Sequence, residues 1–432
     1  MKLKLVIVWI GLMLMLVQAR AELMIEITKG SDSALPIAVV PFANKGGVPV
    51  PYDIAKIVAN DLQRSGDFDT LPTSRMLSLP DQQAQIHYRD WRLLGQSYVL
   101  VGQITYSEHE KKYEVRYELI DVYSQKRLLG EVISSGKQGL RKLGHHISDV
   151  VYERILGVKG AFSTKIAYIT LKQLTQNKQE YRLQIADADG QNDYTLFKSR
   201  EPMLSLAWSN DGQHLAYTSF DSGRPAIYIS HVKSGKQRKV TAFKGLNGAP
   251  MWSPDDSSLV MTLSKDGNAE LYRYNLASNK VDRLTNHYGI DTEASWSPDG
   301  KELVFTSDRS GKPQVYRMSL KDRVPQRLTF EGRYNARPRF SLDGQTLYFV
   351  HQVNGDFHIA SMEMASGETR ILTSTPLDES PSLAPNGRMI IYATRRNNKG
   401  VLAVVSVDGG SKYFLPSTHG EVREPAWSPF LN

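Results

Sequence analysis

The chain repeats one phrase at a nearly constant spacing, and this repeat constrains its fold more than any other feature. The clearest copy is SWSPDGKELVFT, which runs from Ser295 to Thr306. An aromatic or apolar residue near the start of each copy stands 44, 44, 44, 43 and 44 residues before the next. These landmarks are Trp208, Trp252, Trp296, Phe340, Leu383 and Trp427. Fixed-period self-similarity of this kind predicts a repeat architecture.

Each repeat has the composition of four short strands. In the third copy the segments EASWSP, ELVFTSD, PQVYRMSL and PQRLTF are rich in Val, Phe, Tyr and Thr, which favour strands. Asp299-Gly300 provides a tight turn between the first two segments. A helical solenoid would need amphipathic helices, and the repeats contain none. Four antiparallel strands in a period of about 40–45 residues predict a β-propeller blade.

The last copy is incomplete, and its missing part lies before the first full copy. PAWSP at 425–429 is a first strand without the other three, whereas residues 165–200 hold three strands without a first one. Pairing the two segments completes a sixth blade and leaves no open sheet edge at the ends of the array. We interpret the repeat residues as structural, with the Trp between blades and Asp-Gly at the turn. Asp256 replaces this Gly in the second copy, which predicts a looser turn and no other effect.

Residues 22–160 lack the repeat and predict an α/β domain. Residues 53–66 form an amphipathic helix with Asp53 as N-cap and Gly66 as terminator. A second helix covers 140–157, and strands cover 37–42, 97–106, 112–122 and 127–134. Gly157 and Gly160 mark a hinge to the propeller. The predicted fold class is therefore an α/β amino-terminal domain followed by an all-β six-bladed β-propeller closed by the C-terminal strand. The predicted domains are a cleaved signal peptide at 1–21, the α/β domain with a mobile N-terminal strand at 22–160, and the propeller at 161–432.

The first residues have the three parts of an export signal. Lys2 and Lys4 precede an uncharged run from Leu5 to Val17, and Ala19-Arg20-Ala21 follows, which predicts cleavage after Ala21. A membrane anchor would need about 20 apolar residues. Removal of Lys2, Lys4 and Arg20 lowers the net charge from +8 to 8 − 3 = +5, which gives little reason to expect a nucleic-acid partner. The chain has no Cys, which favours the bacterial periplasm over a disulfide-rich extracellular setting. We expect a periplasmic mature protein without a transmembrane segment.

Catalytic motifs are missing from the sequence. His109-Glu110 does not continue into a metalloprotease HExxH, and no G-x-S-x-G or G-x-G-x-x-G occurs. We interpret His145 and His146 as exposed or partly packed side chains, and the acidic segment from Asp187 to Asp193 as a hairpin turn in place of a calcium loop. No cofactor and no metal are expected. The alternative is a propeller-based hydrolase or peptidase-like enzyme, which would need convergent carboxylates or a nucleophile–base pair in the central channel.

Particular strings give the chain a resemblance to a known family. NGAP at 247–250, DTEASWSPDG at 291–300, LDESPSLAPNG at 377–387 and AWSPFL at 426–431 resemble, in sequence and order, the TolB family of the periplasmic Tol–Pal system. The resemblance covers the whole mature chain. It implies a non-enzymatic adaptor that binds the lipoprotein Pal through the propeller and TolA through the amino-terminal end. It also implies a role in outer-membrane integrity and constriction at cell division, with colicins and other outer-membrane lipoproteins as further partners.

The positions three and four residues before each landmark should circle one mouth of the propeller channel. They are Leu204, Ser205, Gly248, Ala249, Thr292, Glu293, Ala336, Arg337, Glu379, Ser380, Arg423 and Glu424. Their charges alternate in sign, which suits a polar protein partner. Together with the resemblance, this predicts a Pal contact at Leu246, Ala249, Thr292, Glu293, Ala336, Arg337, Glu379, Ser380, Arg423 and Glu424.

The segment after the expected cleavage site alternates apolar and other residues. Two interpretations remain open: a permanently paired edge strand of the α/β domain, or a transferable strand on the flexible tether Gly30-Ser31-Asp32-Ser33. Since the resemblance implies a TolA contact at this end, the predicted TolA-binding residues are Glu22, Leu23, Met24, Ile25, Glu26, Ile27 and Thr28.

Overall fold

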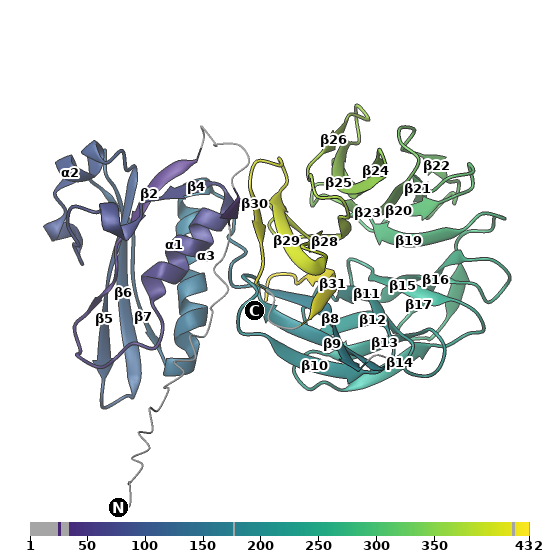
Figure 1. Cartoon of the computed structure of the whole chain (residues 1–432), viewed down its shortest axis with the longest axis horizontal. Coiled ribbons are helices and arrows are strands. Elements are labelled where there is room, and N and C mark those ends of the chain that lie inside the picture. Colours follow the sequence, from purple (N-terminus) through teal and green to yellow (C-terminus); the bar gives the residue numbers. More distant parts are fainter. Residues whose placement is uncertain (1–24, 27–33, 176–177, 417–419, 432) are drawn as a thin grey trace, which may run out of the picture.

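The computed structural model describes residues 25–26, 34–175, 178–416 and 420–431. It has two parts side by side, an α/β part in purple and blue and a ring of blades from teal to yellow (Figure 1). The predicted signal peptide, residues 1–21, lies outside the described residues. The predicted fold class is confirmed.

The α/β part is built on one mixed sheet. The strand order is β4-β2-β5-β6-β7, and β3 also pairs with β5. β2 runs parallel to β4 and to β5, whereas β5, β6 and β7 form an antiparallel meander. The strands are β2 (Leu35–Val39), β3 (Ala43–Asn44), β4 (Phe68–Thr70), β5 (Tyr98–Ser107), β6 (Lys112–Asp121) and β7 (Arg127–Ser135).

Two long helices cover one face of this sheet. α1 (Ile54–Ser65) begins at Asp53, whose side chain accepts a hydrogen bond from the Lys56 amide, and it ends at Gly66 with φ of 79°. α3 (Leu140–Leu156) ends at Gly157, also left-handed with φ of 70°. Both ends of α1 follow the predicted caps. The apolar sides of the two helices share a buried cluster with the inward residues of β2, β5 and β6, as their periodicity predicts.

The opposite face has a smaller cover that the sequence did not predict. α2 (Tyr88–Leu93) and the 3₁₀ turns Thr73–Arg75 and Gln83–Gln85 lie here. Trp91 of α2 is buried against Val99, Val101 and Ile120 of the sheet. The sheet is therefore buried on both sides. One turn, Lys137–Gly139, leads into α3.

The propeller consists of six antiparallel blades, and in blades one to five the strands follow one another in chain order. Blade one is β11 (Met203–Trp208), β12 (His214–Ser219), β13 (Ala226–His231) and β14 (Gln237–Thr241). Blade two is β15 (Asn247–Trp252), β16 (Ser258–Leu263), β17 (Glu270–Asn275) and β18 (Val281–Arg283). Blade three is β19 (Asp291–Trp296), β20 (Glu302–Ser307), β21 (Gln314–Ser319) and β22 (Gln326–Arg327).

The remaining blades complete the ring. Blade four is β23 (Asn335–Phe340), β24 (Thr346–Val353), β25 (Asp356–Glu363) and β26 (Thr369–Ile371). Blade five is β27 (Glu379–Leu383), β28 (Met389–Arg396), β29 (Lys399–Ser406) and β30 (Lys412–Phe414). Blade six joins β31 (Glu421–Trp427) from the end of the chain to β8 (Lys165–Thr175), β9 (Lys178–Asp187) and β10 (Tyr194–Ser199).

The repeat residues hold neighbouring blades together, as predicted. The indole N–H of Trp252 donates to the carbonyl of Ala207 in blade one at 3.1 Å, and that of Trp208 donates to Ala426 at 3.1 Å. At the closing blade, Trp427 donates to the hydroxyl of Thr164 at 2.8 Å. Because Trp252 and Trp208 each bond to the preceding blade, the repeat determines the packing between blades as well as the strands within them.

The turns of the repeat contain one contact that the sequence did not predict. Asp256 has φ of 56°, the left-handed conformation that Gly212, Gly300 and Gly344 adopt at the same place. Its carboxylate accepts hydrogen bonds from the Asn210 amide and side chain, each at 2.8 Å, and from the Asp211 amide at 2.9 Å. The interpretation of Asp256 as a loosened turn is wrong, because this side chain ties blade two to blade one.

The connection between the two parts is fastened to α3. The Asp149 carboxylate accepts hydrogen bonds from the amides of Phe162 and Ser163 at 2.7 and 3.1 Å. A side chain on Gly160 would meet Asp149 at 2.5 Å, so this glycine is needed for close packing. The predicted hinge is thus a packed connection in this structure.

Candidate functional site

The first strand of each blade carries one residue in a left-handed conformation. These residues have φ between 50° and 56°, and the strand register shifts beside them, so each marks a β-bulge. They are Ser205, Ala249, Glu293, Arg337, Ser380 and Glu424, the later member of each pair predicted for the channel mouth. We call them the bulge ring. The structure places them inside the first strands of the blades.

Arg337 is the centre of the bulge ring. Its guanidinium donates to the Glu293 carboxylate at 2.7 Å and to the Glu424 carboxylate at 3.1 Å, and it also contacts the Ser380 hydroxyl. The second oxygen of Glu424 accepts a hydrogen bond from the Ser205 amide at 2.9 Å. The ring therefore joins side chains and backbone from five of the six blades across the channel.

The charges in the ring stabilise one another. Burial alone would raise the pKa of Glu424, but the Arg337 charge outweighs burial and holds this pKa below its ordinary value. Burial would likewise lower the pKa of Arg337, but Glu424 and Glu293 raise it further than burial lowers it. Two carboxylates do converge in the channel, as an enzyme would require. Both are engaged by one arginine, so neither is a free acid or base.

The predicted Pal-contact residues divide into three groups. Ala249, Glu293, Arg337, Ser380 and Glu424 line a channel cavity of about 410 Å³. Leu246 and Glu379 are exposed, and Thr292 and Arg423 are partly exposed at the mouth. Ala336 is only 1% exposed, so its side chain is unavailable to a partner. The predicted Pal contact at Ala336 therefore has no exposed side chain to use.

Large apolar side chains surround the same mouth, and the sequence reasoning missed most of them. They lie in the loops that lead into β15, β19 and β23. Their exposed fractions are 36% for Phe243, 39% for Leu246, 84% for Tyr288, 48% for Ile290 and 72% for Phe330. We call these five residues the apolar rim. The sequence does contain a pattern that could have located the three aromatic residues of this rim. Each follows a threonine of the repeat by no more than three residues: Phe243 after Thr241, Tyr288 after Thr285 and Phe330 after Thr329.

The amino-terminal segment pairs with the propeller. β1 (Ile25–Glu26) lies antiparallel to β30, with Ile25 opposite Tyr413 and Glu26 opposite Lys412. This contradicts the interpretation of the segment as an edge strand of the α/β sheet. Glu22, Leu23, Met24, Ile27 and Thr28 lie outside the described residues.

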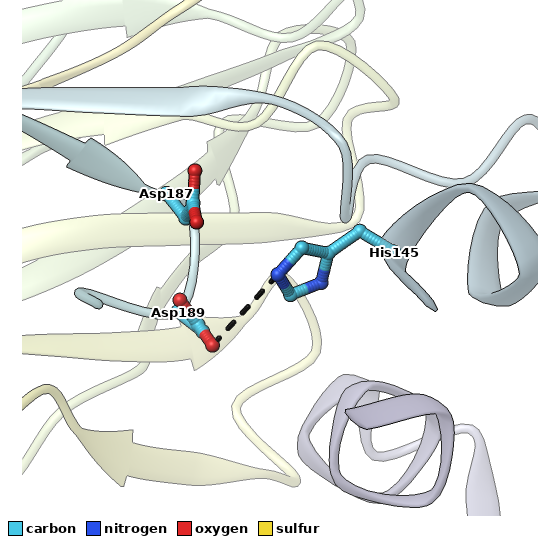
Figure 2. A group of neighbouring side chains, drawn as sticks. All are labelled: His145, Asp187 and Asp189. Carbon is cyan, nitrogen blue, oxygen red and sulfur yellow. Dashed lines mark ion pairs between the residues drawn. The ribbon is translucent and has the colours of Figure 1, made fainter. Parts of the chain in front are cut away.

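A buried ionic cluster connects the two parts of the chain. The Nδ1–H of His145 in α3 donates to the Asp61 carboxylate, 2.7 Å away, and the other ring nitrogen faces Asp189 at 3.9 Å. Figure 2 shows this imidazole between α3 and the turn that carries Asp187 and Asp189. His145 is 2% exposed, so the interpretation of it as an exposed or partly packed side chain is wrong. The segment from Asp187 forms the predicted turn.

The same cluster has the residue types of a metal site, but its oxygens already have donors. Asp187 accepts from Arg141 at 3.0 Å and contacts Lys165, and Asp189 contacts Arg141 and accepts from the Gln191 amide at 3.0 Å. A divalent cation would have to displace these donors and sit beside their positive charges. We therefore interpret the cluster as a structural ion network between the two parts.

Within the described ranges, none of the helices has the length and apolar character that crossing a membrane requires.

Comparison with known proteins gives similarity along the whole chain. Residues 23–128 match the family model of the TolB amino-terminal domain, and residues 152–431 match that of the TolB beta propeller domain. A Tol-Pal system protein TolB of Hahella chejuensis is 63% identical over 414 residues, covering 96% of each chain. One of Pseudomonas syringae pv. tomato is 56% identical over 416 residues, again covering 96% of each. The crystal structure of TolB from Acinetobacter baumannii superposes with a TM-score of 0.86 at 44% identity, covering 95% of this chain and 100% of that one.

Proposed function

Because the chain belongs to the TolB family of Tol–Pal system proteins, we propose that it is a periplasmic, non-enzymatic adaptor that binds the lipoprotein Pal and the protein TolA. Pal binds at the propeller mouth formed by the bulge ring and the apolar rim, and TolA binds the amino-terminal segment. In this role the protein supports outer-membrane integrity and constriction during cell division. Colicins and other outer-membrane lipoproteins are further candidates for the same surfaces.

The apolar rim is the observation that carries the Pal assignment. Contiguous apolar side chains on a protein surface are characteristic of protein interaction sites. Here aromatic residues project from neighbouring loops, and the charged Glu379 and Arg423 lie on the same mouth. An apolar centre with a polar surround is the usual composition of a protein–protein interface. The rigid bulge ring beneath provides a fixed floor for such a contact.

Substitution at the apolar rim tests the Pal assignment. Tyr288→Ser and Phe330→Ser remove side chains that are 84% and 72% exposed, so thermal unfolding should remain unchanged. Aromatic anchors at interfaces commonly contribute about 2 kcal/mol or more, so each change should weaken Pal binding at least about thirtyfold in calorimetry. Charge reversal at Glu293 is a poorer test, because it would also break the ion pair with Arg337.

Val324→Ser is the matched control. Val324 is 62% exposed and lies in the turn between β21 and β22, at the opposite end of blade three from Tyr288. This variant should bind Pal with wild-type affinity. Unchanged Pal affinity in both rim variants would refute the assignment of Pal to this mouth.

The TolA assignment is supported by the position of β1 at the edge of the blade-five sheet, outside β30. An edge strand near a chain end can open without disturbing the strands behind it. A released strand can pair with the sheet edge of a partner through its backbone. Deletion of residues 22–29 should abolish TolA binding and leave Pal binding intact, as measured by calorimetry with each partner. A deletion variant that binds TolA as tightly as the full chain would contradict this assignment.

A further inference from the structure

The channel cavity extends away from the mouth assigned to Pal. Its lining begins at the bulge ring and continues along the first strands to Asn210, Leu342, Pro385 and Phe430, beside or beyond the first turns of the blades. On the Pal side, the Arg337 ion pairs with Glu293 and Glu424 cross the channel. The cavity therefore lies between the bulge ring and the opposite end of the propeller.

One charged side chain distinguishes the next layer of the wall. The residues two positions after the bulge ring are Ala207, Met251, Ser295, Arg339, Ser382 and Ala426, and all of them except Ser295 line the cavity. Arg339 has the positively charged side chain of this layer, and none of the other five residues has a carboxylate. Its guanidinium makes one hydrogen bond, to the Pro338 carbonyl at 2.8 Å, and it forms no ion pair with any residue in the described part of the chain. Arg339 is half-buried and lines the cavity.

The environment of Arg339 does not compensate its charge. Burial lowers the pKa of Arg339 to about 10, and the neighbouring positive charge of Arg337 acts in the same direction. Glu293 and Glu424 act in the opposite direction, but burial is the largest effect and outweighs them. A desolvated guanidinium with free N–H donors gains stability from an added anion.

We propose that this cavity binds a monocarboxylate with an apolar body, and that Arg339 anchors its carboxylate. A guanidinium matches a carboxylate with two parallel hydrogen bonds. Met251, Leu342, Pro385 and Phe430 provide apolar wall for the rest of the molecule. The volume of about 410 Å³ falls within the range of small-molecule pockets, about 300–1,000 Å³. A doubly charged anion such as phosphate fits less well, since Glu293 and Glu424 lie near a single unpaired cation.

The two sites share the bulge ring, which lines the cavity and also forms the floor of the assigned Pal contact. Arg339 lies two residues further along its strand and is not among the residues assigned to Pal, so loss of carboxylate binding in an Arg339 variant does not imply loss of Pal binding. Trp208 and Trp427 line the cavity, so their fluorescence reports occupancy directly.

The experiment titrates the full chain with hexanoate, benzoate, hexanamide and inorganic phosphate at constant ionic strength. Tryptophan fluorescence and calorimetry follow binding. We expect hexanoate or benzoate to bind with one-to-one stoichiometry, while the uncharged hexanamide and phosphate bind at least tenfold more weakly. Stronger binding of phosphate, or no binding of either carboxylate, would overturn the proposal.

Arg339→Gln is the decisive variant, with Arg423→Gln as the control because Arg423 lies at the Pal mouth. Arg339→Gln should lose at least tenfold in carboxylate affinity and keep its unfolding temperature, and Arg423→Gln should bind carboxylates like the wild type. Leu342→Trp enlarges a side chain of the cavity wall and leaves Arg339 in the sequence, so it should also lose binding. This variant keeps the test valid if Arg339→Gln folds poorly. Carboxylate affinity that survives both Arg339→Gln and Leu342→Trp would show that binding occurs elsewhere.

Discussion

Replacing Asp256 with Gly should destabilise the propeller, although Gly occupies this turn position in other blades. In blade one, Asn210 stands where the second and third copies of the repeat have Pro254 and Pro298, so its backbone N–H is available. Asp256 accepts that N–H, the Asn210 side chain and the Asp211 N–H. Two departures from the repeat, 46 residues apart, therefore contact each other across neighbouring blades.

The magnitude follows from two opposing effects. Three hydrogen bonds at about 1 kcal/mol each contribute about 3 kcal/mol. Gly would recover about 1 kcal/mol, because a residue with a side chain is strained at the left-handed φ of 56°. The net loss should be about 2 kcal/mol, which corresponds to a fall of roughly 5 °C in unfolding temperature for a domain of this size.

Urea and thermal unfolding followed by tryptophan fluorescence measure this change, since Trp208 and Trp252 lie in the two blades concerned. Asp256→Asn should fall between the wild type and Asp256→Gly. The amide oxygen can keep the two bonds to Asn210, but the amide nitrogen faces the Asp211 N–H. If Asp256→Gly unfolds at the wild-type temperature or above it, the contact has no energetic role and the reasoning is wrong.

Two further predictions concern the ion networks. Arg337→Met should destabilise the protein by about 3 kcal/mol in urea unfolding, because it leaves Glu293 and Glu424 unpaired in the channel; a stability equal to that of Arg339→Gln would contradict this. Burial would lower the pKa of His145, but Asp61 and Asp189 outweigh burial and raise it above 6.5. The protonated ring therefore stabilises the fold fully below pH 6.5, and this stability is lost as pH rises through the folded pKa. In His145→Gln, the unfolding temperature should depend less on pH between 6.5 and the folded pKa of His145. If the variant shows the same pH dependence as the wild type, protonation of His145 does not stabilise the fold.

Features encoded within one repeat or one helix were predictable from the sequence, and contacts between distant segments were not. The landmark spacing predicts the six blades because every copy carries its own turn and Trp signals. Asp53 and Gly66 likewise mark the ends of α1 by local chemistry. The Arg337 ion pairs join residues 44 and 87 positions apart, and their geometry depends on the bulges. The pairing of β1 with β30 joins segments almost 390 positions apart, and a local alternation of residues does not select one sheet edge over another.

Because the strand that closes the propeller is the last to be synthesised, the ring of blades cannot close until the chain is almost complete. β31 must meet β8, and the hydrogen bonds that seal the two, from Lys165 to Ser428 and from Trp427 to Thr164, span 263 residues. A nascent chain that has been synthesised only as far as blade five lacks Glu424, so Arg337 lacks one of its two carboxylate partners. The channel of this chain also lacks the strand that blade six contributes to its wall. Contacts this distant form late in folding. The mouth is thus complete only when the last strand has paired. A chain that is cut short before β31 should contain the sequence of five whole blades but no binding site.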